Sequence, residues 1–195
     1  MSVLRLSDFN SPVEFYENRF MYHGMSSGYG GHYSNKEENF CYHLAAEKML
    51  YHNSMDRITI LDVGSGLGNF YKFLKASFQK KFYYTGVDFN EKVNQIARLH
   101  YNDETFKTID FLDIPNNVKY DFVYCFGIIG YEEDFLPYIE RCYSLCRTSF
   151  AIQVFVRHPY LRTYDFEYQS KMIKPLKYIN GFRHSQNSII WFGKR

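Results

Sequence analysis

The chain has 195 residues, which is enough for one sizeable domain with a hydrophobic core and hardly enough for two. Hydrophobic residues make up 46% and charged residues 23%, the composition of a soluble globular protein. A formal net charge of +2, with no block of like charge, argues neither for nor against a nucleic-acid partner. The start, MSVLRLSDFN, lacks an apolar stretch of signal-peptide length, and the absence of any 18-residue apolar run excludes a membrane-spanning helix.

The four cysteines show no spacing that indicates a disulfide framework or a metal site. Cys142 and Cys146 lie four residues apart on a predicted helix, but no second pair of Cys or His accompanies them. We therefore expect reduced thiols in the core, no bound metal and no membrane association. These features predict a cytoplasmic protein.

The first segment with a clear pattern is YHGMSSGYGGHY, residues 22–33, whose glycine density excludes a regular helix or a central strand. After it, Ser34 and Glu37 form a capping-box pattern that opens a predicted helix of about fifteen residues. We expect residues 1–52 to form an N-terminal lid segment followed by this helix.

From Ile58 onward, apolar runs alternate with segments of helical periodicity. The predicted strands are residues 58–63 (ITILDV), 82–88 (FYYTGVD), 106–111 (FKTIDF), 120–129 (YDFVYCFGII) and 149–156 (SFAIQVFV). The predicted helices are marked by apolar residues between Phe70 and Phe78, Val93 and Tyr101, and Phe135 and Cys146, with Pro137 in the first turn of the last. This alternation predicts an α/β fold, with a doubly wound, mostly parallel sheet and helices on both faces.

The C-terminal end has a different pattern. Residues 176–182 (LKYINGF) and 188–193 (SIIWFG) are strand-like runs, and a short polar connection that includes RHSQ separates them. So short a connection permits only an antiparallel hairpin. The sequence therefore predicts an α/β sheet that ends in an antiparallel hairpin.

The loop LDVGSGLGNF, residues 61–70, decides the class of ligand. A P-loop needs Lys and then Ser or Thr after its last glycine, but Asn69 and Phe70 follow Gly68. The glycines are spaced GxGxG, so Asn69 occupies the place of the third glycine in the dinucleotide fingerprint. Asp62 would also repel a pyrophosphate at the helix N-terminus. A cationic ligand without phosphate, such as S-adenosylmethionine, suits this loop.

These residues resemble a known family. LDVGSGLG is similar to the first motif of the class I S-adenosylmethionine-dependent methyltransferases, and GVDFN to the second. The resemblance runs from about Ile58 to Phe155, and the compact members from bacterial and phage genomes are similar in length. It implies a Rossmann-like, seven-stranded sheet of order 3-2-1-4-5-7-6. It also implies one domain, residues 1–195, with a cofactor-binding core at 58–155 and a substrate-side loop, helix and hairpin at 156–195.

The resemblance implies roles for individual residues around S-adenosylmethionine. Asp62, with the loop backbone at Gly64, would lie near the methionine amino group, and Asp88 would accept both ribose hydroxyls. The remaining implied cofactor-binding residues are Ser65, Gly66 and Gly68 in the loop, Phe89 against the adenine, Asp110 and Phe111 near the adenine amino group and ring, and Cys125, Phe126 and Gly127 beside the methionine arm. Asp113 competes with Asp110 for the adenine amino group, and the sequence leaves both open.

The acceptor is less well defined by the sequence. Amino-methyltransferases of nucleic-acid bases carry a [DNS]PP[YFW] tetrapeptide at the end of the fourth strand, where this chain has CFGI. The cytosine C5 enzymes use a Pro-Cys nucleophile, but Tyr124 precedes Cys125, which we interpret as a buried strand residue. The absence of these motifs argues against base methylation and leaves RNA ribose, protein and small-molecule acceptors open, of which we expect a small molecule. An RNA methyltransferase and a non-catalytic binding module with the same fold are the alternatives.

Two segments are candidates for contact with the acceptor, because active sites in such sheets lie beyond the carboxyl ends of the strands. They are residues 22–33 and residues 156–164, VRHPYLRTY. His158 and His23 are candidate general bases, since imidazole titrates near neutral pH. Methyl transfer from a sulfonium is a direct displacement, so positioning alone is an alternative to base catalysis.

Overall fold

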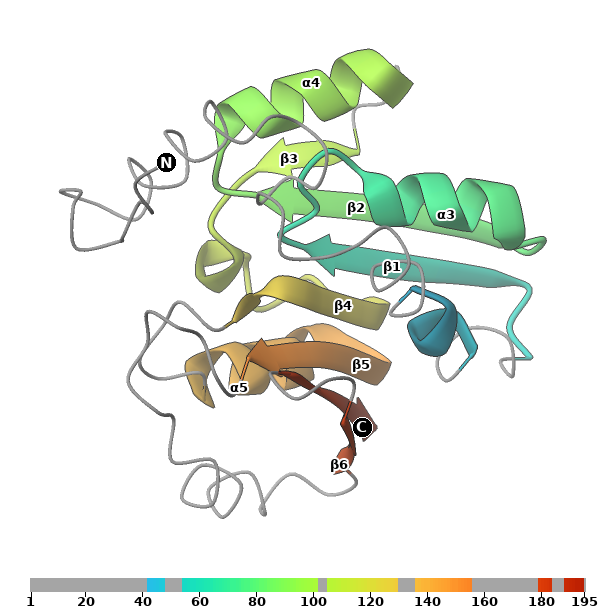
Figure 1. The fold of residues 1–195 in the computed structure, drawn as a ribbon, viewed down its shortest axis with the longest axis vertical. Helices are drawn as coiled ribbons and strands as arrows, with labels where there is room; N and C mark the ends of the chain where they lie inside the picture. The colour runs from blue at the N-terminus through green and yellow to red at the C-terminus, as the bar shows by residue number, and fades with distance from the viewer. Residues whose placement is uncertain are drawn as a thin grey trace, which may run out of the picture.

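The computed structural model of the chain describes residues 42–47, 54–101, 105–129, 136–155, 179–183 and 188–194. Residues 42–47 are helical. The other elements are β1 (Arg57–Val63), α3 (Asn69–Ser77), β2 (Lys81–Asp88), α4 (Glu91–Tyr101), β3 (Phe106–Thr108), the 3₁₀ helix η3 (Phe111–Asp113), β4 (Tyr120–Ile129), α5 (Leu136–Leu145), β5 (Cys146–Phe155), β6 (Ile179–Arg183) and β7 (Ser188–Lys194). Figure 1 shows their arrangement.

Five parallel strands form the centre of the fold, in the order β3-β2-β1-β4-β5 (Figure 1). The chain crosses from β1 outward to β2 and β3 and then returns to β4 on the other side of β1. The strand order reverses between β1 and β4, and this is where open α/β sheets bind their ligands. The structure confirms the predicted α/β fold with a parallel sheet in this order.

Two shorter strands follow β5 in the sheet. β7 pairs antiparallel with β5 from Ser149 opposite Lys194 to Phe155 opposite Ser188. β6 pairs antiparallel with β7. Residues 184–187, which connect β6 to β7, lie outside the described residues.

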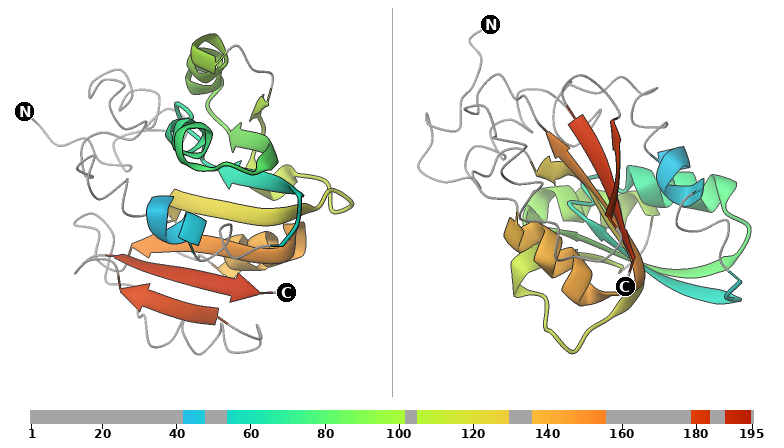
Figure 2. Two further views of the ribbon diagram at one scale, coloured as in Figure 1. Left: turned by 90° about the vertical axis from the view of Figure 1, so that its right-hand side faces the viewer. Right: turned by 90° about the horizontal axis from the view of Figure 1, so that it is seen from below.

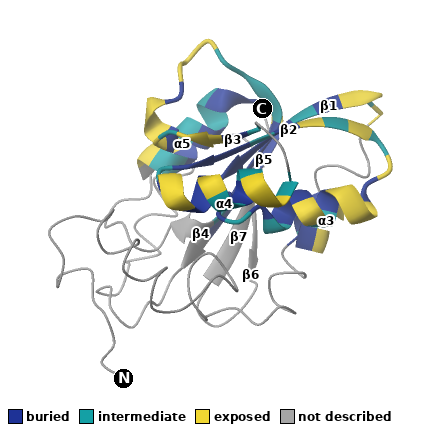
Figure 3. Ribbon diagram, turned by 90° about the horizontal axis from the view of Figure 1, so that it is seen from above, coloured by how far each residue is buried: buried dark blue, intermediate teal, exposed yellow. Residues whose placement is uncertain are grey.

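Helices lie on both faces of the sheet (Figure 2), and buried residues gather in its strands (Figure 3). On one face, α3, α4 and the helical residues 42–47 pack through a cluster that includes Leu74, Ala97 and Tyr42. On the other face, α5 and η3 pack through a cluster that includes Ile139 and Phe111. This arrangement follows from the near-continuous apolar runs of β1 and β4, because a strand covered on both faces buries consecutive side chains.

Two predicted boundaries are wrong. Cys146 was expected on the third helix, but α5 ends at Leu145 and Cys146 begins β5 opposite Tyr120. The predicted third strand ends at Thr108, because Asp110 caps η3 instead of continuing the sheet. Pro137 lies in the first turn of α5, as expected. The predicted capping box and glycine–aromatic stretch lie outside the described residues.

No helix in the described part of the chain is long and apolar enough to span a membrane. Cys125, Cys142 and Cys146 are buried free thiols, as expected from the sequence.

Candidate functional site

The glycine loop connects β1 to α3 at the carboxyl edge of the parallel strands (Figure 1). Gly64, Gly66 and Gly68 have φ angles of 69°, 51° and 79°, a left-handed conformation that residues with a Cβ rarely adopt. The backbone N–H groups of Gly64 and Ser65 donate to the carbonyl of Val87 at 2.8 and 3.0 Å. The loop is therefore tied to the carboxyl end of β2, where Asp88 follows.

Gly68 has a packing role that its place in the loop did not reveal. A Cβ at this position would lie 2.7 Å from ring carbons of both Phe106 and Tyr101. Gly86, in the middle of β2, is equally confined, because its Cβ would lie 2.8 Å from Phe106 and 2.8 Å from the Ser65 hydroxyl. Small residues at Gly68 and Gly86 thus let the loop, the start of α3 and β2 come together around Phe106.

Asp88 is buried, with 3% of its surface exposed, and its carboxylate braces the backbone around it. One carboxylate oxygen accepts from the Gly66 N–H at 3.2 Å, and the other accepts from the Asn90 N–H at 2.9 Å. Asp88 therefore joins the glycine loop to the turn that starts α4.

Two asparagines support this carboxylate, and sequence reasoning missed both. The Asn90 side chain caps α4 by accepting from the Lys92 N–H at 3.1 Å. The fully buried Asn94 amide donates to the Asp88 carbonyl at 2.9 Å and to Thr108 Oγ1 at 3.0 Å. Asn94 thereby fixes the carboxyl ends of β2 and β3 next to each other. A polar residue on the buried face of an amphipathic helix was the signal that could have identified it.

Asp62 is buried at the carboxyl end of β1, and the Tyr84 hydroxyl donates a hydrogen bond to its carboxylate. Sequence reasoning assigned no role to Tyr84. Burial, and then the negative charge of Asp62, raise the pKa of Tyr84 well above its ordinary value. The tyrosine therefore stays protonated and remains a donor to Asp62.

The segment after β3 holds the three residues predicted near adenine. Asp110 is exposed, and its carboxylate accepts from the Leu112 N–H at 2.9 Å as the cap of η3. Asp113 is also exposed. The Phe111 ring is buried and stacks on Tyr138 of α5, with ring centroids 6.2 Å apart. Phe89 is half-buried directly after Asp88.

Aromatic side chains form a stacked column at the end of β4. The rings of Phe126 and Tyr124 lie 4.0 Å apart with an interplanar angle of 3°, and Tyr124 stacks on Phe70 of α3 at 3.9 Å. On the opposite face, burial and the neighbouring Cys142 raise the pKa of the Cys125 thiol well above its usual value. A thiol kept protonated in this way is a poor nucleophile, which fits the interpretation of Cys125 as a core residue.

The site that these elements form has two buried carboxylates, Asp62 and Asp88, and the glycine loop at the start of α3. The Ser65 hydroxyl is buried and makes no hydrogen bond among the described residues. Such a set of acceptors and one available hydroxyl fits a ligand rich in hydroxyl and amino groups. Within the described ranges, no three His, Cys, Asp or Glu side chains group as metal ligands.

The structure does not place every predicted site residue. His23 and His158, the candidate general bases, lie outside the described residues, as do the segments 22–33 and 156–164. Gly127 lies within β4. The described part of the site is therefore its cofactor side, and the acceptor side remains a prediction.

Comparison with known proteins identifies relatives of this architecture. A methyltransferase-domain family profile matches residues 61–149. Magnesium protoporphyrin IX methyltransferase from Synechocystis PCC 6803, solved with bound S-adenosylmethionine, is 16% identical with a TM-score of 0.68, over 92% of this chain and 95% of that one. The N-methyltransferase NodS from Bradyrhizobium japonicum WM9, solved with S-adenosyl-L-homocysteine, is 11% identical with a TM-score of 0.68. The match covers 94% of this chain and 97% of that one.

A class I methyltransferase structure from Listeria monocytogenes is 16% identical with a TM-score of 0.63, and the match covers 98% of this chain and 70% of that one. No curated protein sequence matches the chain significantly.

Proposed function

We propose that this chain, a member of the class I S-adenosylmethionine-dependent methyltransferases, transfers a methyl group from S-adenosylmethionine to a small-molecule acceptor. The observation that carries the proposal is the buried Asp88 carboxylate. It lies at the carboxyl end of β2, next to the point where the strand order reverses, and it is held there by the N–H groups of Gly66 and Asn90. A carboxylate at the position of Asp88 would also suit the ribose of a dinucleotide, but the second buried carboxylate, Asp62, would repel a pyrophosphate at the glycine loop.

The described residues would hold the cofactor as follows. The Asp88 carboxylate would accept charge-assisted hydrogen bonds from the two ribose hydroxyls. Asp62, oriented by Tyr84, would attract the methionine amino group, while the Ser65 hydroxyl and the loop backbone at Gly64 and Gly66 would lie against the methionine part. Gly68 would shape the loop, and the remaining proposed contacts are Phe89, Asp110 and Phe111 around the adenine and Cys125, Phe126 and Gly127 near the methyl group.

When bound, the cofactor would supply an electrophilic methyl group on a cationic sulfur. The acceptor nucleophile would take the methyl group, and the sulfur would leave as the thioether of S-adenosylhomocysteine. The residues of this chain would contribute orientation and exclusion of water, since a direct displacement depends on alignment more than on acid–base chemistry. The stacked Phe126 and Tyr124 rings would form one rigid wall beside the reacting group. We propose His158 and His23 as candidates for removing the proton that the acceptor loses.

The acceptor that we propose is a small molecule. The similar structures include methyltransferases of a porphyrin and of nitrogen acceptors. RNA is the alternative acceptor, and a binding module without catalysis is the alternative from another class. We further propose a single cytoplasmic domain in which residues 1–52 cover the cofactor, residues 58–155 bind it, and residues 156–195 contribute the acceptor side and a closing antiparallel hairpin.

The test combines binding with turnover. Calorimetry should show binding of S-adenosylhomocysteine and no binding of NAD, and S-adenosylhomocysteine should accumulate when the protein and S-adenosylmethionine are incubated with a metabolite extract. Asp88→Ala is the control for site-dependent turnover. Ribonuclease-treated extract separates a small-molecule acceptor from RNA. Binding without turnover in any extract would favour the binding module, and NAD binding without S-adenosylhomocysteine binding would overturn the proposal.

A further inference from the structure

The Tyr84 side chain reaches from the middle of β2 toward the carboxyl end of β1, on the face of the sheet that α3 covers. Its Cα partner on β1 is Ile60, but its hydroxyl donates to Asp62, two residues closer to the glycine loop. The residue directly opposite Asp62 is Gly86, which has no side chain to offer. Tyr84, the diagonal neighbour, therefore supplies the donor that β2 gives to Asp62.

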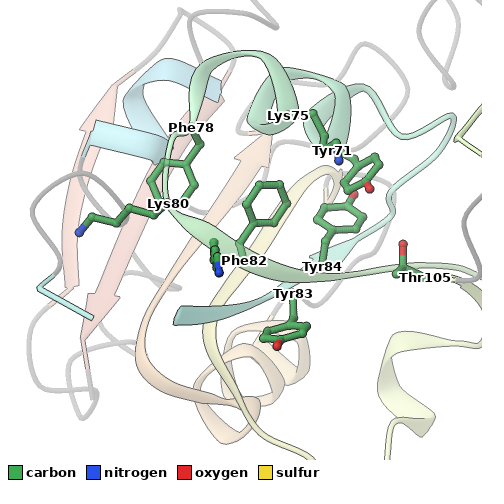
Figure 4. Close-up of a pocket in the computed structure, with 9 residues that line it drawn as sticks. Tyr71, Lys75, Phe78, Lys80, Phe82, Tyr83, Tyr84 and Thr105 are labelled. Carbon is green, nitrogen blue, oxygen red and sulfur yellow. The ribbon is translucent and has the colours of Figure 1, made fainter. Parts of the chain in front are cut away.

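Rings from two other elements hold the Tyr84 ring in place. The centroid of Tyr71, in the first turn of α3, lies 4.8 Å away, and that of Phe106, the first residue of β3, lies 5.7 Å away. Figure 4 shows Tyr84 extending from β2 toward α3 beside Tyr71, where both line a cavity of about 520 Å³, whereas Tyr83 points to the other side of the strand. Only 4% of Tyr84 is exposed. A ring packed in this way fixes the position of its hydroxyl before any ligand binds.

Asp62 is a carboxylate that needs hydrogen-bond donors, because only 3% of its surface is exposed and a buried negative charge is costly without partners. The Tyr84 hydroxyl supplies one such donor. Burial and the charge of Asp62 raise the pKa of Tyr84 well above its ordinary value, so the hydroxyl keeps its proton. A neutral donor leaves the negative charge of the carboxylate intact, and an ammonium group on a ligand would complement that charge.

We propose that Tyr84 is a positioning residue for the amino group of the cofactor: its hydroxyl holds the Asp62 carboxylate in place, and that carboxylate binds the ammonium. The inference rests on the proposed function, because the ligand is the amino-acid end of S-adenosylmethionine. Tyr84 acts through Asp62 and not by contact with the ligand. The consequence is selectivity, since the pair favours nucleoside thioethers that carry a free amino group over those that lack one.

Calorimetry with three related ligands tests the proposal on the full-length protein. The ligands are S-adenosylhomocysteine, its decarboxylated analogue, and the analogue that has hydrogen in place of the α-amino group. All three keep the adenosine and the thioether, so they differ only in the groups that the amino-acid end presents. Tyr84→Phe should lower the affinity of the two amino-bearing ligands by about fivefold or more, because Asp62 loses a charge-assisted hydrogen bond. The affinity of the amino-free analogue should stay at the wild-type value.

Two further variants show whether Tyr84 acts through Asp62. Asp62→Asn removes the charge and should weaken the same two amino-bearing ligands by about tenfold or more. The double variant Asp62→Asn, Tyr84→Phe should lose little more affinity than Asp62→Asn alone, because the tyrosine has no separate contact with the ligand. Tyr83→Phe is the matched control: it makes the same change on the adjacent, exposed tyrosine, and all three affinities should equal those of the wild type.

The ligand series separates positioning from a merely structural role. Tyr84→Phe keeps the ring that packs against Tyr71 and Phe106, so the variant should fold, and urea unfolding checks this. Equal weakening of all three ligands in Tyr84→Phe would show that the hydroxyl only supports the fold, and wild-type affinity for all three would show that Asp62 does not need it; either result overturns this inference alone. A wild-type protein that binds none of the three ligands overturns the proposed function and this inference with it.

Discussion

The hydroxyl of Tyr84 donates to the carboxylate of Asp62, and this hydrogen bond joins the middle of β2 to the carboxyl end of β1. Both residues are buried on the face of the sheet that α3 covers. Asp62 leads into the glycine loop, whereas Tyr84 forms part of the wall of the cavity at the sheet edge. One pair of side chains therefore connects the interior of β2 with the residue that leads into the glycine loop.

Tyr84→Phe tests the pH dependence that this pair creates. The pKa of Tyr84 is raised above its ordinary value of about 10, so the stabilisation from its retained proton is complete below pH 10 and is lost as the pH rises toward the folded-state pKa. Urea unfolding of the wild type between pH 9 and about 11.5 should show a falling free energy, and Tyr84→Phe should show a shallower fall. At pH 7 the variant should lose about 1–3 kcal/mol, because Asp62 loses a buried donor.

Tyr83→Phe is the control for this experiment, since Tyr83 is the adjacent tyrosine and 61% of its surface is exposed. Its unfolding free energy should follow the wild-type pH profile. Identical profiles for Tyr84→Phe and the wild type would show that Asp62 does not depend on the tyrosine proton.

Asp88→Ala should weaken S-adenosylhomocysteine binding by more than about tenfold, since it removes the acceptor proposed for both ribose hydroxyls. It should also destabilise the fold by about 1–3 kcal/mol, because the N–H groups of Gly66 and Asn90 lose their partner in a buried place. Asp88→Asn keeps an acceptor oxygen, so its S-adenosylhomocysteine affinity and its unfolding free energy should lie between those of the wild type and those of Asp88→Ala. Calorimetry and urea unfolding measure the two effects; wild-type affinity in Asp88→Ala would remove Asp88 from the site.

Gly86→Ala and Gly68→Ala separate crowding from backbone conformation. A Cβ at either position meets Phe106 at 2.7–2.8 Å, but only Gly68 also has a positive φ, of 79°. Gly86→Ala should cost about 1–3 kcal/mol through overpacking, and Gly68→Ala about 1–2 kcal/mol more through its left-handed backbone. Combining each change with Phe106→Leu should recover the part of the crowding that Phe106 causes, while the contacts with Tyr101 at Gly68 and with Ser65 at Gly86 remain. Equal recovery of full stability in both double variants would contradict a conformational cost at Gly68.

Asn94→Ala tests whether the carboxyl ends of β2 and β3 are positioned by this buried amide. The variant should lower the unfolding free energy by about 1–3 kcal/mol, since the Asp88 carbonyl loses its amide donor. S-adenosylhomocysteine affinity should fall as well, because Asp88 follows the movement of its own backbone. Gln95→Ala, the next residue along α4, is exposed and should change neither quantity. Wild-type binding in Asn94→Ala would limit the residue to a structural role.

The parallel sheet could be predicted because each of its strands has a recognisable apolar pattern in its own stretch of sequence. β1 and β4 are nearly continuous apolar runs, and the structure places them at the centre, where both faces are covered. The boundary errors came from residues whose role depends on distant partners. Cys146 fits an apolar helical position as well as a strand, and pairing with Tyr120 decides between them.

The glycine loop and the two acidic residues could be predicted because motif spacing specifies them. The residues that position the loop and these carboxylates could not be predicted. In the sequence, Tyr84 has the pattern of any strand tyrosine, and only the structure shows its hydrogen bond to Asp62. Likewise, a glycine such as Gly86 is unfavourable in a strand, and only the structure shows that Phe106 and Ser65 leave no room for a side chain there. Contacts between residues twenty or more positions apart leave no local pattern in a single sequence.

The short pairing of β3 with β2 has a consequence for self-association. β3 pairs only with Gly86–Asp88, so among the described strands the first five residues of β2 have a partner on the β1 side alone. An open strand edge is a template for another chain, and charged side chains are a common protection against aggregation there. Lys80 and Lys81 stand at the start of this edge. Two copies that joined along it in parallel would bring their ammonium groups together, so replacing these lysines with apolar residues should favour strand-to-strand aggregation at this edge.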